Sequence, residues 1–243
     1  MERIKSISLW SGLLGFVVVA LGAWTRLADA GLGCPDWPGC YGFVTIPVTP
    51  EEINLANSSF PETPYEVAKA IPEVVHRYFA AALGFFIVCI AFLAYTNKDV
   101  PANVKKISLF LLVWVIMQGT FGYWTVSLKL WPQVVTTHLM SGFLTTAFVW
   151  LLYFKAKDHL ENRSKWDFEL ITKRLFNISI LLVAIQIFLG AWTSTNYASY
   201  SCTDFPLCQG QVLPEADFKE GFNFFQSIGP VSYTHLRAHE TSL

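Results

Sequence analysis

Two histidines stand at the edge of, or inside, long uncharged stretches of the sequence. His76 lies just before the uncharged run 78–96, and His138 lies about two helical turns into the run 130–154. Ionisable groups at membrane depth are costly and usually functional. If both runs cross a membrane in the same direction, the two imidazoles lie at similar depth, and such a pair on neighbouring helices of a bundle can ligate one haem iron. The alternative is a pair of core histidines that only satisfy hydrogen bonds.

An acidic and a basic residue flank the first histidine. Glu73 precedes His76 by three residues, so a helix would place both on one face, with the carboxylate near the rim of a haem held by His76. An ordinary interfacial glutamate is the alternative. Arg77 could pair with a haem propionate or extend to the membrane surface. The Glu-x-x-His spacing also occurs in di-iron bundles, but these need a second such motif, and no glutamate stands three residues before His138.

Four of the five cysteines form two equally spaced pairs. Cys34 and Cys40 enclose a segment with two prolines and a glycine, which bends the chain enough to bring the sulfur atoms together. Cys202 and Cys208 enclose a gap of the same length. We predict both disulfides, provided that the loops face an oxidising compartment. The sequence leaves open whether these bridges are structural or exchange electrons with a partner thiol.

The composition indicates an all-α integral membrane protein. Of the 243 residues, 53% are hydrophobic and only 14% are charged, against about 25% charged residues in a soluble domain. The net charge of −1 does not suggest nucleic acid as a partner. Five uncharged runs are near or above the roughly 20 residues that a spanning helix needs. They are residues 7–25, 78–96, 107–128, 130–154 and 175–198.

The distribution of lysine and arginine predicts the orientation. With the N-terminus in the cytoplasm, eleven of these residues fall in inside segments and five in longer outside segments. Residues 1–6, 97–106 and 155–174 are therefore expected in the cytoplasm of a bacterial-type plasma membrane, and both cysteine loops outside. The first run resembles a signal peptide, but it is too long for one and a matching segment recurs in mid-chain, so we expect a retained helix.

An internal repeat organises the chain. Nine identities recur 168 residues apart without a gap. They are Gly22, Ala23, Trp24, Thr25, Cys34, Asp36, Pro38, Cys40 and Gly42, which match Gly190, Ala191, Trp192, Thr193, Cys202, Asp204, Pro206, Cys208 and Gly210. Four runs separate the two starts, so the repeat unit is four helices with parallel orientation. A weaker copy, Gln118-x3-Gly122-x-Trp124-Thr125, suggests that the run 107–128 is related as well.

The repeat sets the expected domain organisation. Residues 1–174 are predicted to form a four-helix transmembrane haem-binding bundle, and residues 175–230 the first helix and cysteine loop of a second, incomplete bundle. Residues 231–243 are polar and unlike the rest, so we expect a non-native tail and assign no role to its histidines. In the first loop, Thr49-Pro50-Glu51-Glu52 and Thr63-Pro64-Tyr65-Glu66 each predict the start of a short helix.

These motifs together resemble the haem A synthase family over residues 1 to about 230. The resemblance rests on Gly22-Ala-Trp-Thr-Arg-Leu27, on Gly31-Leu-Gly-Cys-Pro-Asp-Trp-Pro-Gly-Cys-Tyr-Gly42, on Glu73-Val-Val-His-Arg77, on Gln118-Gly-Thr-Phe-Gly-Tyr-Trp-Thr-Val126, on His138-Leu139 and on the second cysteine loop.

The resemblance implies an oxidoreductase of cytochrome oxidase assembly. Such enzymes oxidise a ring methyl of haem O, through a hydroxymethyl intermediate, to the formyl group of haem A. By resemblance, His76 and His138 ligate the substrate haem O, Glu73 is the catalytic carboxylate, and a haem b occupies the second module, whose ligands are missing here. The chain is therefore expected to bind the first haem but not the second, and the sequence leaves open whether it is active without the missing helices. Implied partners are the lipid bilayer, a haem O synthase and an external electron acceptor.

Two other functions remain open from the sequence. A non-catalytic bis-histidine cytochrome b subunit would explain the histidines and leave Glu73 without a role. A membrane thiol oxidoreductase would explain the cysteines alone and need no haem.

Overall fold

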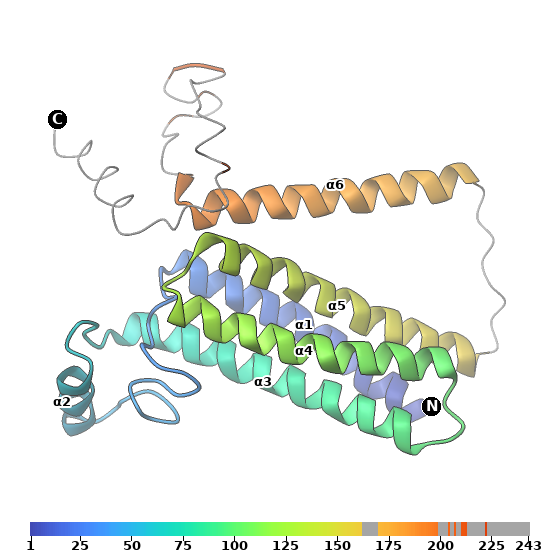
Figure 1. Cartoon of the computed structure of the whole chain (residues 1–243), viewed down its shortest axis with the longest axis horizontal. Helices are drawn as coiled ribbons and strands as arrows, with labels where there is room; N and C mark the ends of the chain where they lie inside the picture. Colours follow the sequence, from blue (N-terminus) through green and yellow to red (C-terminus); the bar gives the residue numbers. More distant parts are fainter. Residues whose placement is uncertain (162–169, 199–203, 205–206, 208–209, 213–221, 223–243) are drawn as a thin grey trace.

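The computed structural model describes residues 1–161, 170–198, 204, 207, 210–212 and 222. The regular secondary structure of this part is helical (Figure 1). Its helices are α1 (Glu2–Leu27), α2 (Pro50–Ser59), α3 (Val67–Thr96), α4 (Ala102–Ser127), α5 (Pro132–Leu160) and α6 (Leu170–Thr195). All except α2 are long and apolar enough to cross a membrane. The prediction of an all-α membrane protein with five spans is confirmed for this part of the chain.

Helices α1, α3, α4 and α5 form a four-helix bundle. Helix α1 packs against α3 and α5, and α4 packs against the same two helices. Helices α3 and α5 make no contact with each other, so they lie diagonally across the bundle. The expectation that the two histidines stand on neighbouring helices is therefore wrong, because their helices are diagonal in the bundle.

Small residues allow α1 and α5 to approach closely. Ser8, Ser11, Gly12 and Gly15 lie along one side of α1 and are buried. A Cβ atom added at Gly12 would lie 2.8 Å from a ring carbon of Trp150. Close packing of this kind replaces the hydrophobic driving force that helices lack in lipid.

The apolar core fills the half of the bundle that contains the N-terminus. Its buried residues come from the start of α1 and α4 and from the end of α3 and α5. They include Ile4, Leu83, Ile87, Ile90, Leu111, Val149 and Leu152. Glu73, His76 and His138 lie on the other half of their helices, toward the end that carries the loop of residues 28–66. We call this the loop end of the bundle.

Helices α1, α4 and α6 end in the same backbone turn. Asp29, Lys129 and Tyr197 have φ angles of +49°, +50° and +54°, the left-handed conformation that often follows a helix. Each lies seven residues after the glycine of a Gly-x-Trp-Thr segment. The third copy of the motif, which is weak in sequence, is therefore clear in the backbone.

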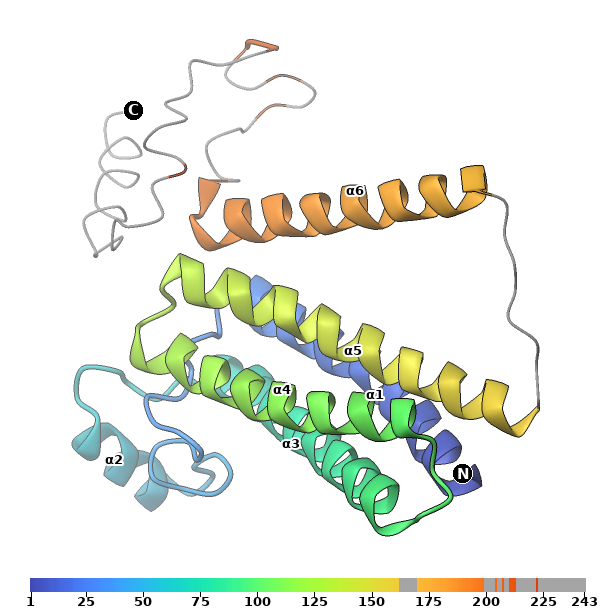
Figure 2. The same cartoon turned by 45° about the vertical axis from the view of Figure 1, so that its right-hand side comes forward.

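Helix α6 contacts the bundle only near its own C-terminus. It packs against α5, and its buried residues are Ala191, Trp192 and Thr195 (Figures 1 and 2). Arg26 donates hydrogen bonds to Ser194 Oγ at 3.2 Å and to the Tyr197 hydroxyl at 2.9 Å. Arg26 and Ser194 are equivalent positions of the repeat, 168 residues apart. The equivalent ends of α1 and α6 thus meet, as they would beside a pseudo-twofold axis.

The first loop folds into a small unit at the loop end. Thr49 and Glu52 form a capping box, which confirms the predicted helix start at Pro50. The second predicted start, at Thr63, is wrong. No separate helix begins there, and α3 begins at Val67 and continues through Pro72 to the end of the run.

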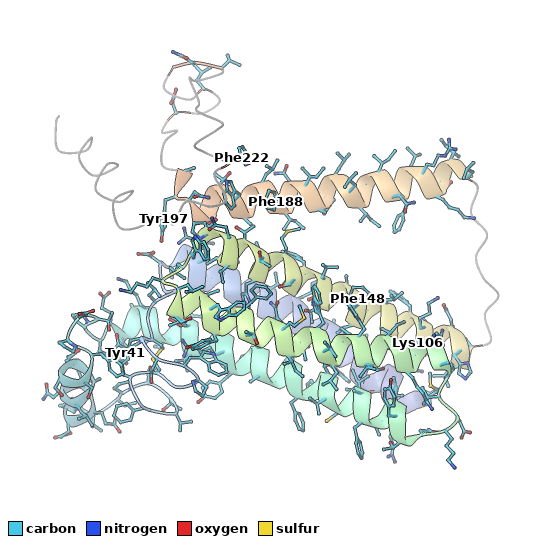
Figure 3. The ribbon with its side chains drawn as sticks, in the orientation of Figure 1. Tyr41, Lys106, Phe148, Phe188, Tyr197 and Phe222 are labelled. Atoms are coloured by element: carbon cyan, nitrogen blue, oxygen red, sulfur yellow. A yellow bond between two sulfur atoms is a disulfide. The ribbon has the colours of Figure 1, made fainter. Side chains whose placement is uncertain are left out.

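A cluster of buried side chains holds this loop against the start of α3. Tyr41 lies in the loop beside the start of α3 (Figure 3). It packs edge-on against Phe60 and Tyr65, with ring centroids 5.6 and 5.3 Å apart. Burial raises the pKa of the Tyr41 hydroxyl, so the group stays protonated and donates a 3.2 Å hydrogen bond to the carbonyl of Pro64. The loop is therefore positioned on the helix that carries Glu73 and His76.

Candidate functional site

His76 lies near the beginning of α3 and packs against a glycine of α1. A Cβ atom at Gly22 would lie only 3.1 Å from Cε1 of the imidazole. The ring also lies within hydrogen-bonding reach of the carbonyl of Val18, one turn earlier on α1. Its Nδ1 atom is buried and has no hydrogen-bond partner.

His138 has an equivalent environment in the other helix pair of the bundle, α4 and α5. A Cβ atom at Gly122 of α4 would lie 3.4 Å from its Cε1. The ring lies within hydrogen-bonding reach of the carbonyl of Gln118, again one turn before the glycine. Its Nδ1 atom is also buried without a partner.

The two histidine sites are therefore related by internal pseudo-symmetry. Gly22 and Gly122 occupy the same place in their Gly-x-Trp-Thr segments, and each makes room for a histidine of the next long helix. The helix pairs α1/α3 and α4/α5 correspond to each other. The imidazoles of His76 and His138 are close enough to interact electrostatically across the bundle.

This arrangement fits a ligand that takes electron pairs from two imidazoles. Buried polar atoms are almost always hydrogen-bonded, and each exception calls for an explanation. Two such exceptions are Nδ1 of His76 and Nδ1 of His138, which belong to diagonal helices and to imidazoles close enough to interact electrostatically. A haem iron accepts an axial ligand from each side, and bundle cores commonly hold such groups. The residues present are thus compatible with a haem between α3 and α5.

Glu73 is buried and bound to the disulfide loop. Its side chain is 6% exposed. One carboxylate oxygen accepts a hydrogen bond from the backbone N–H of Cys34 at 2.9 Å, and the other pairs with Arg77 at 2.5 Å. Glu73 and His76 share α3 at a spacing of three residues, so the predicted juxtaposition on one helical face is present.

Arg77 binds the same loop through its other nitrogen. Its Nη1 donates to the carbonyls of Asp36 and Gly39, at 2.8 and 2.5 Å. The guanidinium therefore joins Glu73 to two carbonyls inside the disulfide loop. Neither expected partner, a propionate or the membrane surface, is needed to explain its position.

The disulfide loop is closed by a bond and by a carboxylate. Cys34 and Cys40 are bonded, which confirms this prediction. The Asp36 carboxylate accepts hydrogen bonds from the N–H groups of Tyr41, at 2.6 Å, and Gly42, at 2.8 Å. Gly42 has a φ of +80°, a conformation that favours glycine.

The second loop repeats one of these contacts. Asp204 accepts a 2.8 Å hydrogen bond from the N–H of Gly210, which has a φ of +76°. These residues are the repeat equivalents of Asp36 and Gly42. The predicted partners Cys202 and Cys208 lie outside the described residues.

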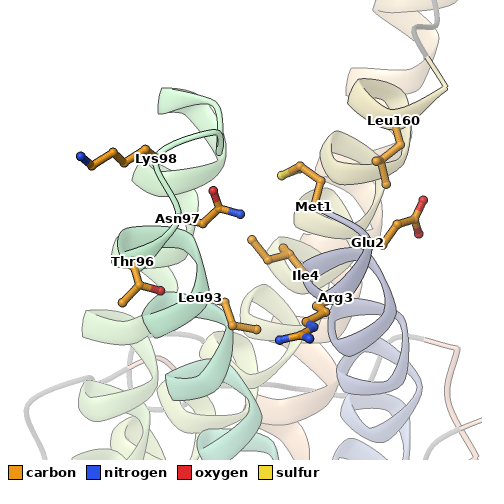
Figure 4. Close-up of a pocket in the computed structure, with 9 residues that line it drawn as sticks. All are labelled: Met1, Glu2, Arg3, Ile4, Leu93, Thr96, Asn97, Lys98 and Leu160. Carbon is orange, nitrogen blue, oxygen red and sulfur yellow. The ribbon is translucent and has the colours of Figure 1, made fainter.

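A cavity of about 660 Å³ opens at the N-terminal end of the bundle (Figure 4). Residues of α1, α5 and the end of α3 line it, among them Arg3, Leu93 and Leu160. Since His76 and His138 lie toward the loop end, this cavity is separate from the histidine site.

Sequence reasoning missed the residues that hold the two imidazoles. The sequence marked Gly22 and Gly122 as members of repeated Gly-x-Trp-Thr segments, and Gln118 as part of a motif, but assigned no role to any of them. The signal that could have identified them was the position of each glycine relative to a histidine on the following long run. That relation becomes clear only once the helix pairs are known to be adjacent.

Comparison with known proteins gives a consistent assignment. The family model COX15-CtaA, described as cytochrome oxidase assembly protein, matches residues 5–238. The haem A synthase of Shewanella oneidensis is 40% identical over 214 residues, which cover 88% of this chain and 64% of that protein. The haem A synthase of Halalkalibacterium halodurans is 27% identical over 232 residues, covering 92% of this chain and 71% of that protein.

The chain thus spans just under two thirds of the length of the Shewanella relative. No solved structure matches it. Because the family model covers nearly the whole sequence, the chain belongs to the COX15-CtaA family of cytochrome oxidase assembly proteins.

Proposed function

We propose that this chain carries the substrate-binding module of a haem A synthase, with His76 and His138 as the axial ligands of haem O. The observation that supports this most is the pair of buried, unpartnered Nδ1 atoms on two imidazoles that interact electrostatically from diagonal helices. The two named relatives are haem A synthases, so a haem substrate agrees with both the geometry and the family.

Glu73 would act on the reacting methyl group. Conversion of the methyl to a hydroxymethyl group consumes one water and releases two protons and two electrons, and oxidation to the formyl group releases two more of each. A carboxylate beside the ring can stabilise developing positive charge and accept a proton from the attacking water. We assign this role to Glu73 because it is buried on the same helical face as His76. An external acceptor must take the electrons.

The same proposal extends to orientation and domain organisation. The bundle of residues 1–174 would have its N-terminus in the cytoplasm and its disulfide loop outside, with residues 175–230 beginning a second module. The resemblance implies a resident haem b there. Gly190, the equivalent of Gly22, has open space beside it, and no described histidine lies against it. No reaction step is therefore assigned to that group.

Pigment extraction tests the proposed activity. The chain is expressed in cells that make haem O, purified in detergent, and its extracted haems are separated by chromatography. We expect haem O together with its hydroxymethyl or formyl product. A colourless chain would contradict haem binding. A form of the protein that also carries the complete second module, and whose pigment is haem O alone, would contradict the catalytic assignment.

A second candidate is supported by the contacts of Glu73. Since both carboxylate oxygens have partners in the protein, Glu73 can be explained as an anchor of the disulfide loop. The chain would then be a bis-histidine cytochrome that only transfers electrons. Haem binding with no oxidised product would favour this function.

A further inference from the structure

The two histidines are held in different ways despite their pseudo-symmetry. On α1, the position equivalent to Gln118 is Val18, which has no hydrogen-bonding side chain. On α4, the amide of Gln118 donates a 2.9 Å hydrogen bond to the backbone carbonyl of His138. In the part of the chain that the structure describes, α4 thus gives His138 a side-chain hydrogen bond, whereas the corresponding bond from α1, donated by Thr25, goes to the carbonyl of Pro72 and not to His76.

Gln118 contacts the His138 turn at several points. Its backbone carbonyl lies within hydrogen-bonding reach of the imidazole, while its side chain binds the carbonyl of the same residue. Its Oε1 accepts a short hydrogen bond from the hydroxyl of Ser141, which is 7% exposed and lies one turn after His138. The Ser141 hydroxyl also lies 2.7 Å from the carbonyl of Thr137 and 3.0 Å from that of His138, so Gln118 joins a partly buried network that includes the His138 turn.

The surrounding packing leaves little room for another arrangement. A Cβ atom at Gly142 would lie 3.3 Å from Nε2 of Gln118. One turn before Gln118 on α4, Trp114 Nε1 donates a 3.2 Å hydrogen bond to the carbonyl of Ser141 on α5. The amide of Gln118 is thus packed closely between α4 and α5. These contacts restrain how α5 can rotate about its own axis at the turn that carries His138.

We propose that Gln118 is a positioning residue for His138: its amide holds the turn of α5 that carries the imidazole and so fixes His138 as an axial ligand. This inference rests on the proposed function, since it requires that His138 ligates haem. Groups that orient a metal ligand commonly change its binding by about 10- to 100-fold when they are removed. Loss of Gln118 should therefore weaken the binding of His138 to the haem iron and leave the binding of His76 unchanged.

Carbon monoxide binding to the reduced haem tests this. A haem with two firm imidazole ligands has no open position for carbon monoxide, whereas loosening one ligand creates one. For Gln118→Leu in the full chain, we expect haem content near that of the parent and a carbon monoxide-bound fraction about tenfold higher. Thr120→Val, on the exposed side of α4, is the control, because Thr120 bonds only the carbonyl of Ile116 in its own helix.

A second variant guards against a folding defect. Gln118→Glu keeps the shape and the acceptor for Ser141 but removes the N–H donors to the His138 carbonyl, so it should raise carbon monoxide binding in the same way. If both variants bind no more carbon monoxide than the parent chain, Gln118 only joins two helices and the proposal is wrong. If His138→Ala also leaves the parent spectrum and its carbon monoxide binding unchanged, the proposed haem ligation itself has failed.

Discussion

The backbone N–H of Cys34 donates a 2.9 Å hydrogen bond to the buried carboxylate of Glu73. This contact joins the disulfide loop to the helix that carries His76, one turn before the imidazole. The state of the loop and the position of the carboxylate are therefore coupled. The residue that we assign to catalysis thus accepts a hydrogen bond from a loop that the Cys34–Cys40 disulfide closes.

The first prediction concerns the charge of Glu73. Glu73→Gln keeps the size of the side chain and an acceptor for Cys34, but it removes the negative charge and the proton acceptor. We expect unchanged haem content and a fall in oxidised haem product of at least about 100-fold, the usual contribution of a general base. Chromatography of extracted haems measures both quantities.

The control for this variant is Glu66→Gln. Glu66 is an exposed neighbour that pairs with Lys69, so its loss should leave the product unchanged. An active Glu73→Gln variant would show that the carboxylate is a loop anchor and would support the electron-transfer alternative.

The second prediction concerns the guanidinium of Arg77. Arg77→Lys cannot reach Glu73, Asp36 and Gly39 together, because one ammonium group replaces a planar fork of donors. Leaving buried groups unpartnered should lower the free energy of unfolding by about 2 kcal/mol. Thermal unfolding in detergent measures this loss, with Lys69→Ala as the control because an exposed pair contributes about 0–1 kcal/mol. Equal melting temperatures for the two variants would contradict the assigned role.

The third prediction concerns the glycine that faces His76. A leucine at Gly22 must occupy the space of the imidazole, since even a Cβ atom would lie 3.1 Å from it. Overpacking of about 1–3 kcal/mol should displace His76 and remove most of the bound haem, as measured by the Soret absorbance. Gly122→Ala should have a much smaller effect, because its Cβ would be in ordinary contact at 3.4 Å.

Gly190→Leu is the matched control for this third prediction. It is the repeat equivalent of Gly22, and nothing described lies within 4 Å of its added Cβ. If Gly190→Leu and Gly22→Leu lose equal amounts of haem, the loss reflects general instability and the cradle role is incorrect.

The fourth prediction concerns pH and α2. The Glu52 carboxylate accepts hydrogen bonds from the N–H groups of Thr49 and Val48, which lower its pKa below the ordinary value of 4.5. A carboxylate with a depressed folded pKa stabilises the fold above its unfolded pKa, and this contribution is lost as the pH falls through the folded pKa. The protection of backbone amides in residues 48–59 against hydrogen exchange, relative to the intrinsic rate at each pH, should therefore fall below about pH 4.5. Glu52→Gln should remove this dependence, whereas Glu51→Gln should retain it.

The long helices could be predicted because membrane physics leaves few choices. An uncharged run in lipid must satisfy its own backbone, so runs 78–96 and 130–154 could be assigned to helices without any contact information. The capping box at Thr49 and Glu52 was equally readable, because both partners lie within four residues of each other. Local constraints of this kind are written in short stretches of sequence.

The arrangement of the helices required the structure. Uncharged residues on every face of a spanning helix give no signal for which face meets a neighbour, so the diagonal placement of α3 and α5 could not be read. The start of α3 was misjudged because Thr63-Pro64 resembles a helix start, whereas the helix begins at Val67. The bond from Cys34 to Glu73 spans 39 residues and has no local signature.

The optical spectrum of histidine variants tests the central claim most directly. The chain, His76→Ala, His138→Ala and His159→Ala are purified from cells supplied with haem, and their reduced-minus-oxidised spectra are compared. His159 lies near the C-terminal end of α5, far along the helix from His138, and serves as the control. We predict a low-spin haem spectrum for the chain and for His159→Ala, and its loss in each of the other two variants. A spectrum that survives unchanged in both His76→Ala and His138→Ala would contradict the account.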